Sequence, residues 1–351
     1  MAELFENAAD LPEDKTGFWE VEAGFFWNQV GKPERALPME LRAVQKREEY
    51  QHEPEMLAAI YNNVGGSYYA LGDYKEALAY YEKALEIREH VLPKNHPDIA
   101  QSYDNIGGAY IELEDYSNGL AFFLKALCIR ESVLPDDHLD LAISYNNVGG
   151  AYGLQGDREK EMKYYLKALE LRERVLPDNH PDLALGYNNV AMAYGDRGDR
   201  KRELTFHLKA LKIREAVLPS NHPDLAQSYN NVAGTYRTMG DHKKACEYLM
   251  KALRVLEQAL PSNHPRLAMV CSNVAWIYHA LGQLDEAVSF MRRAAQIAEQ
   301  STLLETHHSR MNYSRSADEM ERELVQKKKM EQAIQQKMRE LGMDPFCIFK
   351  R

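Results

Sequence analysis

A block of 42 residues recurs along this chain, and that period constrains the fold more than any other feature. Three kinds of residue keep the interval independently of one another. The positions are Tyr61, Tyr103, Tyr145, Tyr187 and Tyr229; His96, His138, His180, His222 and His264; and Pro93, Pro135, Pro177, Pro219 and Pro261. Self-similarity at a period of roughly 20 to 50 residues is typical of a repeat array, in which each unit packs on its neighbours.

Within the unit that begins at Tyr61, the pattern predicts two helices joined by a tight turn. Apolar and small residues follow helical spacing as far as Gly72, which suits a helix C-cap, and Asp73 can cap the next helix. The second helix is expected to end at Pro93, and Pro97 suits the first turn of the helix after it. Each unit is therefore predicted to be a hairpin of antiparallel helices, and the fold class to be all-α.

The two ends of the chain depart from the period. Region 19–300 is predicted to hold about seven hairpins, of which the first is degenerate. Residues 1–18 are predicted to form an N-terminal extension, and 301–351 a C-terminal capping helix, at about 309–341, with an apolar tail. The capping helix is strongly charged, as the water-facing side of a terminal unit should be.

Two units break the pattern where the helices of the hairpin cross. Glu161 and Glu203 stand where Ala77 and Ala245 stand in their own units. A small residue at this position lets the two helices approach closely. We therefore expect the two glutamate-bearing hairpins to pack this position in another way and to be slightly looser.

The repeat resembles the tetratricopeptide family, and within it the kinesin-light-chain subclass. The family pattern is carried by Gly65, Tyr68, Ala77, Tyr81 and Ala84, and the subclass pattern by the long period, the VLPxNHPDLA link and ALEIRE at 84–89. The resemblance covers about residues 20–299. It implies a solenoid, a right-handed superhelix of hairpins, whose first helices line a concave groove that binds a protein or peptide.

Composition limits the cellular location and the kinds of partner that this chain is expected to have. The formal net charge is −10, which disfavours a nucleic-acid or anionic-membrane surface. No apolar run is long enough to span a membrane, and no signal peptide is apparent. Four isolated cysteines, Cys128, Cys246, Cys271 and Cys347, indicate reduced thiols and a cytoplasmic location. Glutamates flank the Lys327–Lys329 run, so we expect a solvated helix face there and not a nucleic-acid contact.

Catalytic and metal-binding patterns are missing from the sequence. The loop histidines occur once per unit, and stacked helices lie about 10 Å apart, whereas metal ligands lie about 2 Å from the ion. We expect these histidines to have structural or N-cap roles. The glycine pairs, such as Gly65-Gly66, lie inside predicted helices and not in a phosphate-binding loop. The sequence therefore predicts a non-catalytic protein that needs no cofactor or metal.

Asparagine recurs at one position of every full unit, although it is a poor helix former. On groove-lining helices these side chains would offer a donor and an acceptor to the backbone of an extended peptide. The alternative is that they bond to neighbouring helices and only maintain the stack. The ladder residues, as we call them, are Asn63, Asn105, Asn147, Asn189, Asn231 and Asn273.

Positions beside the ladder vary between units and are predicted to set specificity. They are Asn62, Asp104, Asn146, Asn188, Asn230, Met192, Arg237 and Trp276. The face lacks the array of Lys and Arg with which chaperone-binding members of the family clamp a C-terminal carboxylate. We therefore expect a neutral or basic segment, and poor binding of an acidic C-terminal peptide.

These patterns together predict a protein–protein interaction scaffold or adaptor that holds an extended peptide or partner protein. The second hypothesis is a regulatory peptide sensor. Such a sensor generally carries an output domain, so here it would have to act through a separate output protein.

Overall fold

The structure is a computed structural model that describes residues 17–50, 53–301 and 307–340. The predicted N-terminal extension lies almost wholly outside these residues, as does the apolar tail with Cys347. The described residues form α-helices and no strands, which confirms the all-α class. They divide into two compact units, Met1–Pro177 and Asp178–Arg351, which we describe one at a time.

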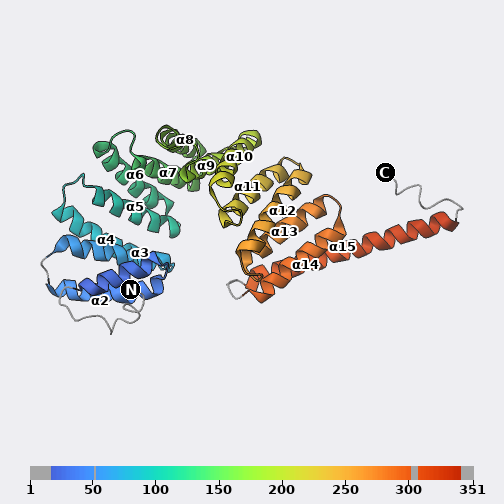
Figure 1. The fold of residues 1–351 in the computed structure, drawn as a ribbon, viewed down its shortest axis with the longest axis horizontal. Helices are drawn as coiled ribbons and strands as arrows, with labels where there is room; N and C mark the ends of the chain where they lie inside the picture. Colours follow the sequence, from blue (N-terminus) through green and yellow to red (C-terminus); the bar gives the residue numbers. More distant parts are fainter. Residues whose placement is uncertain (1–16, 51–52, 302–306, 341–351) are drawn as a thin grey trace. The chain divides into compact units, whose positions relative to one another are not determined.

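Unit 1 consists of four helical hairpins that follow one another along the chain (Figure 1). Its helices are α1 (Phe18–Gln29), α2 (Pro33–Tyr50), α3 (Pro54–Ala70), α4 (Tyr74–Val91), α5 (Pro97–Glu112), α6 (Tyr116–Val133), α7 (Leu139–Leu154) and α8 (Arg158–Val175). Each odd-numbered helix, which we call a first helix, packs on the second helix that follows it. The second helices α2, α4 and α6 also pack on the next first helix, as the repeat pattern predicts.

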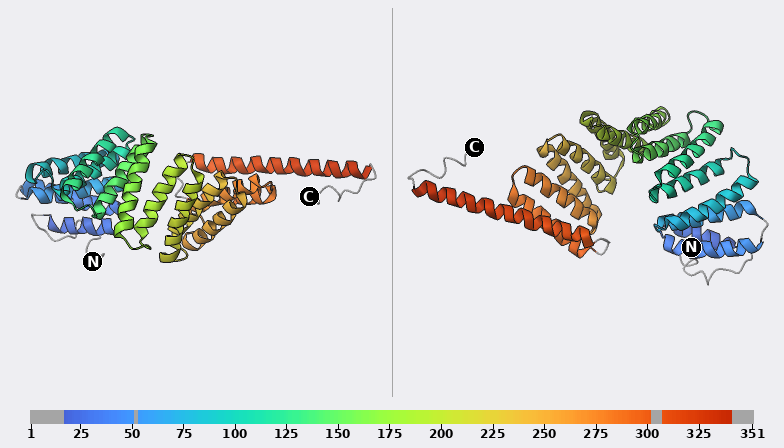
Figure 2. Two further views of the ribbon diagram at one scale, coloured as in Figure 1. Left: turned by 90° about the horizontal axis from the view of Figure 1, so that it is seen from above. Right: turned by 180° about the vertical axis from the view of Figure 1, so that it is seen from behind.

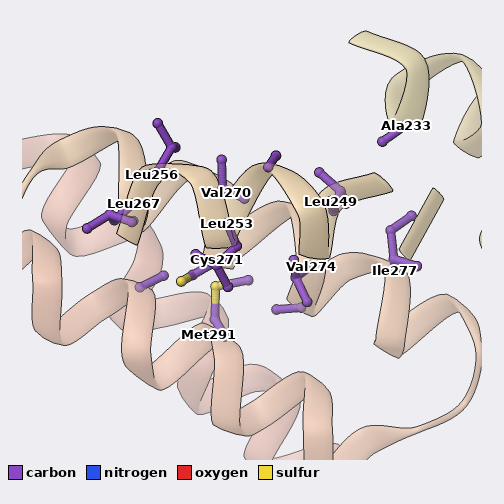
Figure 3. Close-up of a cluster of buried hydrophobic side chains, with 14 of the residues drawn as sticks. Ala233, Leu249, Leu253, Leu256, Leu267, Val270, Cys271, Val274, Ile277 and Met291 are labelled. Atoms are coloured by element: carbon purple, nitrogen blue, oxygen red, sulfur yellow. The ribbon is translucent and has the colours of Figure 1, made fainter. Parts of the chain in front are cut away.

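Unit 2 continues the pattern with three hairpins and one further helix. Its helices are α9 (Pro181–Asp196), α10 (Arg200–Val217), α11 (Pro223–Thr238), α12 (His242–Ala259), α13 (Pro265–Ala280), α14 (Leu284–Gln300) and α15 (His307–Glu340). Figure 3 shows part of its core, where Leu253 of α12, Cys271 of α13 and Met291 of α14 point toward one another.

The hairpin boundaries follow from local capping. Asp73 caps α4 by accepting a hydrogen bond from the backbone N–H of Glu76, and the same contact recurs at later turns. Gly72 takes φ 83°, in the left-handed region that a C′ glycine favours. Glu114 takes φ 62° at the corresponding position, where a side chain is tolerated at some conformational cost.

The two glutamate-bearing hairpins do pack the helix crossing in another way. Glu161 is buried in unit 1, and its carboxylate pairs with Arg158 at 3.0 Å. Room for it comes from Gly153 on α7, where a Cβ atom would lie 2.4 Å from Glu161 Oε1. In unit 2, Gly195 makes the same room for Glu203. A missing side chain on one helix thus compensates for a large one on the other.

Helix α15 packs on α14, as the first helix of a hairpin packs on the second helix before it. Met320 is 2% exposed in the core of unit 2, whereas Met330, ten residues on, is 67% exposed. His279 of α13 lies 2.8 Å from Glu323, and Lys328 pairs with Asp285 at 2.6 Å. The second half of α15 extends past the hairpins of unit 2 (Figure 2).

Candidate functional site

The ladder residues lie one on each first helix from α3 to α13, and each is half-buried. Three of them, Asn105, Asn147 and Asn273, bond across neighbouring repeats, whereas Asn231 Oδ1 accepts from Gln227 Nε2 of its own helix at 2.8 Å. In unit 1, Asn105 Nδ2 donates to Asn62 Oδ1 at 2.7 Å, and in unit 2, Asn273 Nδ2 donates to Asn230 Oδ1 at 3.1 Å. A ladder residue therefore reaches back to the predicted specificity position of the preceding repeat.

The same relationship joins Asn147 of α7 to Asp104 of α5 through a side-chain hydrogen bond. Asp104 also forms an ion pair with Arg130 of α6. Burial raises the pKa of Asp104, while Arg130 and Asn147 act in the opposite direction. Because Arg130 Nη1 also donates to Ser144 Oγ at 2.6 Å, its guanidinium is already held by unit 1 itself.

A cavity of about 490 Å³ opens beside the ladder between α3, α5 and α7; we call it the unit 1 cavity. Its lining combines aromatic rings, carboxylates and amides. It includes Tyr69, Tyr81, Phe123, Tyr165, Asp104, Glu112, Asn105 and Asn147. None of its lining residues, all in the described part of unit 1, is a lysine, arginine or histidine.

Tyrosine hydroxyls in the unit 1 cavity are held in their protonated form. Burial raises the pKa of Tyr69 to about 12, with Glu112 adding to the effect, and burial likewise raises the pKa of Tyr81 to about 12. Tyr69 donates its hydroxyl proton to Glu112 Oε1 at 3.2 Å. The cavity therefore presents acceptor oxygens and ring faces at neutral pH, and no free positive charge.

The corresponding face of unit 2 is more apolar. Met192 on α9 and Trp276 on α13 are exposed, while α11 between them carries Gly234. A smaller cavity of about 70 Å³ lies there, lined in part by Asn230, Arg237 and Asn273. Two of the predicted specificity residues, Asn230 and Arg237, thus line a cavity together with the ladder residue Asn273 in unit 2.

One predicted specificity residue, Asn188, is buried and makes its contact inward. Its Oδ1 accepts a hydrogen bond from Nδ1 of His207 on α10 at 3.0 Å. His207 is 4% exposed, and burial lowers its pKa to about 4, with Glu203 opposing the shift and Arg214 adding to it. The imidazole is therefore neutral, and its role is in the packing of α9 on α10.

Three exposed apolar residues on the ladder face escaped the sequence prediction. Ile143, Leu185 and Met269 each lie four residues before a ladder asparagine, one helical turn away on the same face. Helical periodicity applied backwards from the ladder would have found them. They add apolar contact area at the start of α7, α9 and α13.

The five loop histidines are N-caps, as the sequence predicts. In each case Nδ1 accepts a hydrogen bond from the backbone N–H two residues on, as His96 does from Asp98 at 3.2 Å. Among the residues that the structure describes, no cluster of three or more His, Cys, Asp or Glu side chains could hold a metal ion. Over the same residues, no helix is both long and apolar enough to cross a membrane.

Sequence comparison identifies the repeat. A tetratricopeptide repeat family model matches residues 56–132, 105–174 and 224–300, more than half of the chain. The chain belongs to the tetratricopeptide repeat family. A second tetratricopeptide repeat model matches residues 183–224. No curated protein matches this tetratricopeptide protein significantly in sequence. Family membership indicates a role in protein–protein interaction.

Solved structures share the tetratricopeptide fold of this chain at low identity. BtubC (BKLC) from P. vanneervenii is 24% identical over 64% of this chain and 91% of its own, with a TM-score of 0.57. A putative kinesin light chain from P. anserina, with nearly identical TPR-like repeats, is 20% identical over 59% and 99%, with a TM-score of 0.54. Aspartyl phosphate phosphatase F from Bacillus subtilis is 16% identical over 82% and 71%, with a TM-score of 0.60.

Proposed function

We propose that this tetratricopeptide protein is a non-catalytic, cytoplasmic scaffold or adaptor that binds an extended segment of a partner protein along its first helices. The observation that supports this proposal is how the ladder amides are used. Asn105 has its NH₂ group committed to Asn62, but its Oδ1 accepts no hydrogen bond from any described residue. The same holds for Asn273, which donates to Asn230.

A half-buried amide oxygen of this kind can accept a backbone N–H from a bound chain. Stacking and ligand binding then use different atoms of one side chain, so the two hypotheses for the ladder are compatible. Gly108 lies three residues after Asn105, and a Cβ atom added there would come no closer than 3.9 Å to Tyr69 Oη. A glycine at this place lets another backbone approach the helix closely.

Affinity measurements on ladder variants test the proposal. Peptides of about 12 residues are selected from a random display library on the full chain, and the tightest is measured by fluorescence anisotropy. We expect Asn105→Ala and Asn147→Ala to weaken binding by about three- to tenfold each, the loss of one hydrogen bond. Asn118→Ala is the matched control, because Asn118 is exposed on the second helix α6.

Two results would count against the proposal. One is a selection that yields no peptide. The other is unchanged affinity in both ladder variants together with a lowered melting temperature, which would mean that the ladder serves only the stacking of the repeats.

A further inference from the structure

We propose that the unit 1 cavity takes a lysine or arginine side chain of the bound segment. This inference rests on the proposed function and adds the chemistry of the partner. It is carried by the carboxylate of Glu112 and by the aromatic ring of Tyr69 in the cavity, which have no cationic partner among the described residues.

Charge is the first argument. Asp104 is paired with Arg130, but Glu112 is exposed at the other side of the cavity and forms no ion pair with any described residue. Its one hydrogen bond comes from the neutral hydroxyl of Tyr69. The negative charge of Glu112 therefore faces the cavity without a counter-ion, and a cationic side chain from a partner would supply one.

The aromatic rings give the second argument. On the outer side of the hairpins the chain covers its own rings with cations: Lys125 Nζ lies 4.5 Å from the Phe122 centroid, and Lys83 Nζ lies 4.8 Å from that of Tyr80. Of the rings that line the cavity, Tyr69 is half-buried, whereas Tyr81 and Phe123 are buried, so Tyr69 offers the more accessible ring. In the described residues, no lysine or arginine lies over Tyr69. Aromatic ring faces attract a lysine or arginine that comes within about 6 Å of the centroid.

Space in the unit 1 cavity is kept by glycine. Gly108 and Gly150 both line it, and a Cβ atom on Gly150 would lie 3.3 Å from Tyr165 Oη. With no side chain at these positions, the tyrosine hydroxyls remain reachable from the open side. The volume of about 490 Å³ is that of a typical ligand pocket.

The corresponding place in unit 2 shows the contrast. Arg237 stands where unit 1 has Tyr69, and Leu249 stands where unit 1 has Tyr81. The cavity there is about 70 Å³ and already has a cation in its wall. The corresponding cavity of unit 2 therefore lacks this cation-binding chemistry.

The peptide selection described above also tests this inference. We expect the selected peptides to be enriched in lysine or arginine at one position. Replacing that residue by glutamine should weaken binding at least fivefold. In the chain, Glu112→Gln should weaken the parent peptide about three- to fivefold, as expected for the loss of an exposed ion pair, and should have no effect on the glutamine peptide.

Two further variants separate charge from fold. Glu170→Gln makes the same change on the exposed face of α8 and should leave the affinity unchanged. Tyr69→Phe keeps the ring and removes the hydroxyl, and should retain most of the binding. Circular dichroism checks that each variant is as helical as the parent chain.

The inference is overturned if the selected peptides show no enrichment in cationic residues, or if Glu112→Gln leaves their affinity unchanged. Should Asn105→Ala still weaken those peptides, groove binding would stand and only its proposed chemistry would fall. A selection that yields no peptide would remove both.

Discussion

Arg88 of α4 donates from Nη1 to the hydroxyl oxygen of Ser102 on α5 at 2.7 Å, and both side chains are buried. The same bond joins Arg130 to Ser144 within unit 1, and Arg214 to Ser228 within unit 2, always across 14 residues. Each one ties the last turn of a second helix to the first helix of the next hairpin. At these three junctions, an arginine in the last turn of a second helix thus links one hairpin to the next.

Loss of this hydroxyl should destabilise unit 1. In Ser102→Ala the buried guanidinium of Arg88 keeps its bond to the carbonyl oxygen of Asp98 at 3.0 Å but loses a second acceptor. We expect a cost of about 1–3 kcal/mol in the free energy of unfolding, measured by urea titration. Ser132→Ala on the exposed side of α6 is the control and should change the free energy of unfolding by less than about 0.5 kcal/mol. Equal effects of the two substitutions would contradict this role for Ser102.

The packing of Glu161 against Gly153 predicts that a glycine-to-alanine substitution in a helix will here lower the stability instead of raising it. Gly→Ala inside a helix normally stabilises by up to about 1 kcal/mol. At Gly153 the added Cβ atom would meet the Glu161 carboxylate, so Gly153→Ala should destabilise by about 1–3 kcal/mol in thermal unfolding.

Glu161→Ala in the same chain should restore most of that loss, because it returns the crossing to two small residues. Gly66→Ala, whose nearest contact would be 3.9 Å away, should be neutral or stabilising. Additive effects of Gly153→Ala and Glu161→Ala in a double-mutant cycle would show that the two positions are not coupled.

His207 makes unit 2 sensitive to acid. Its pKa is lowered to about 4 in the folded chain, against about 6.5 in the unfolded chain. Between these values the unfolded state binds the proton and the folded state does not, so stability should fall as the pH drops from about 6.5 to about 4. The loss amounts to about 3 kcal/mol for a shift of this size.

The measurement is the difference in urea midpoint between pH 7 and pH 4.5. Leucine stands at the equivalent position of the next hairpin, as Leu249. His207→Leu removes the titrating group and should therefore reduce that difference in urea midpoint, even though Asn188 loses its hydrogen-bond partner. A variant with the same pH response as the parent chain would show that His207 does not carry the effect.

The hairpins and their caps could be predicted because they depend on residues close together in sequence. Asp73 and His96 act on backbone groups two or three residues away, so their residue types were sufficient. Contacts between helices needed the structure. The fit of Glu161 against Gly153 depends on how α7 crosses α8. The hydrogen bond from Asn105 to Asn62 depends on how the two first helices that carry them are offset, although the residues are 43 positions apart.

The boundary between the two units could not be predicted from the sequence. The link around Pro177 repeats the pattern of the other loops, so nothing local marks it as a boundary. For the candidate site, the sequence was sufficient to place the ladder residues on the first helices, but not to predict the unit 1 cavity. Its walls combine Tyr69, Phe123 and Tyr165, which come from three hairpins and meet only when these stack.

The compensation between Gly153 and Glu161 stays inside one hairpin, and so does the reverse arrangement one hairpin earlier, where Gly119 faces Ile111. Three junctions between hairpins, in contrast, use the same arginine–serine bond, two of them in unit 1 and one in unit 2. We therefore expect a hairpin that follows such a junction to tolerate exchange for another hairpin of the same kind, because the residues that fit its two helices together are carried with it.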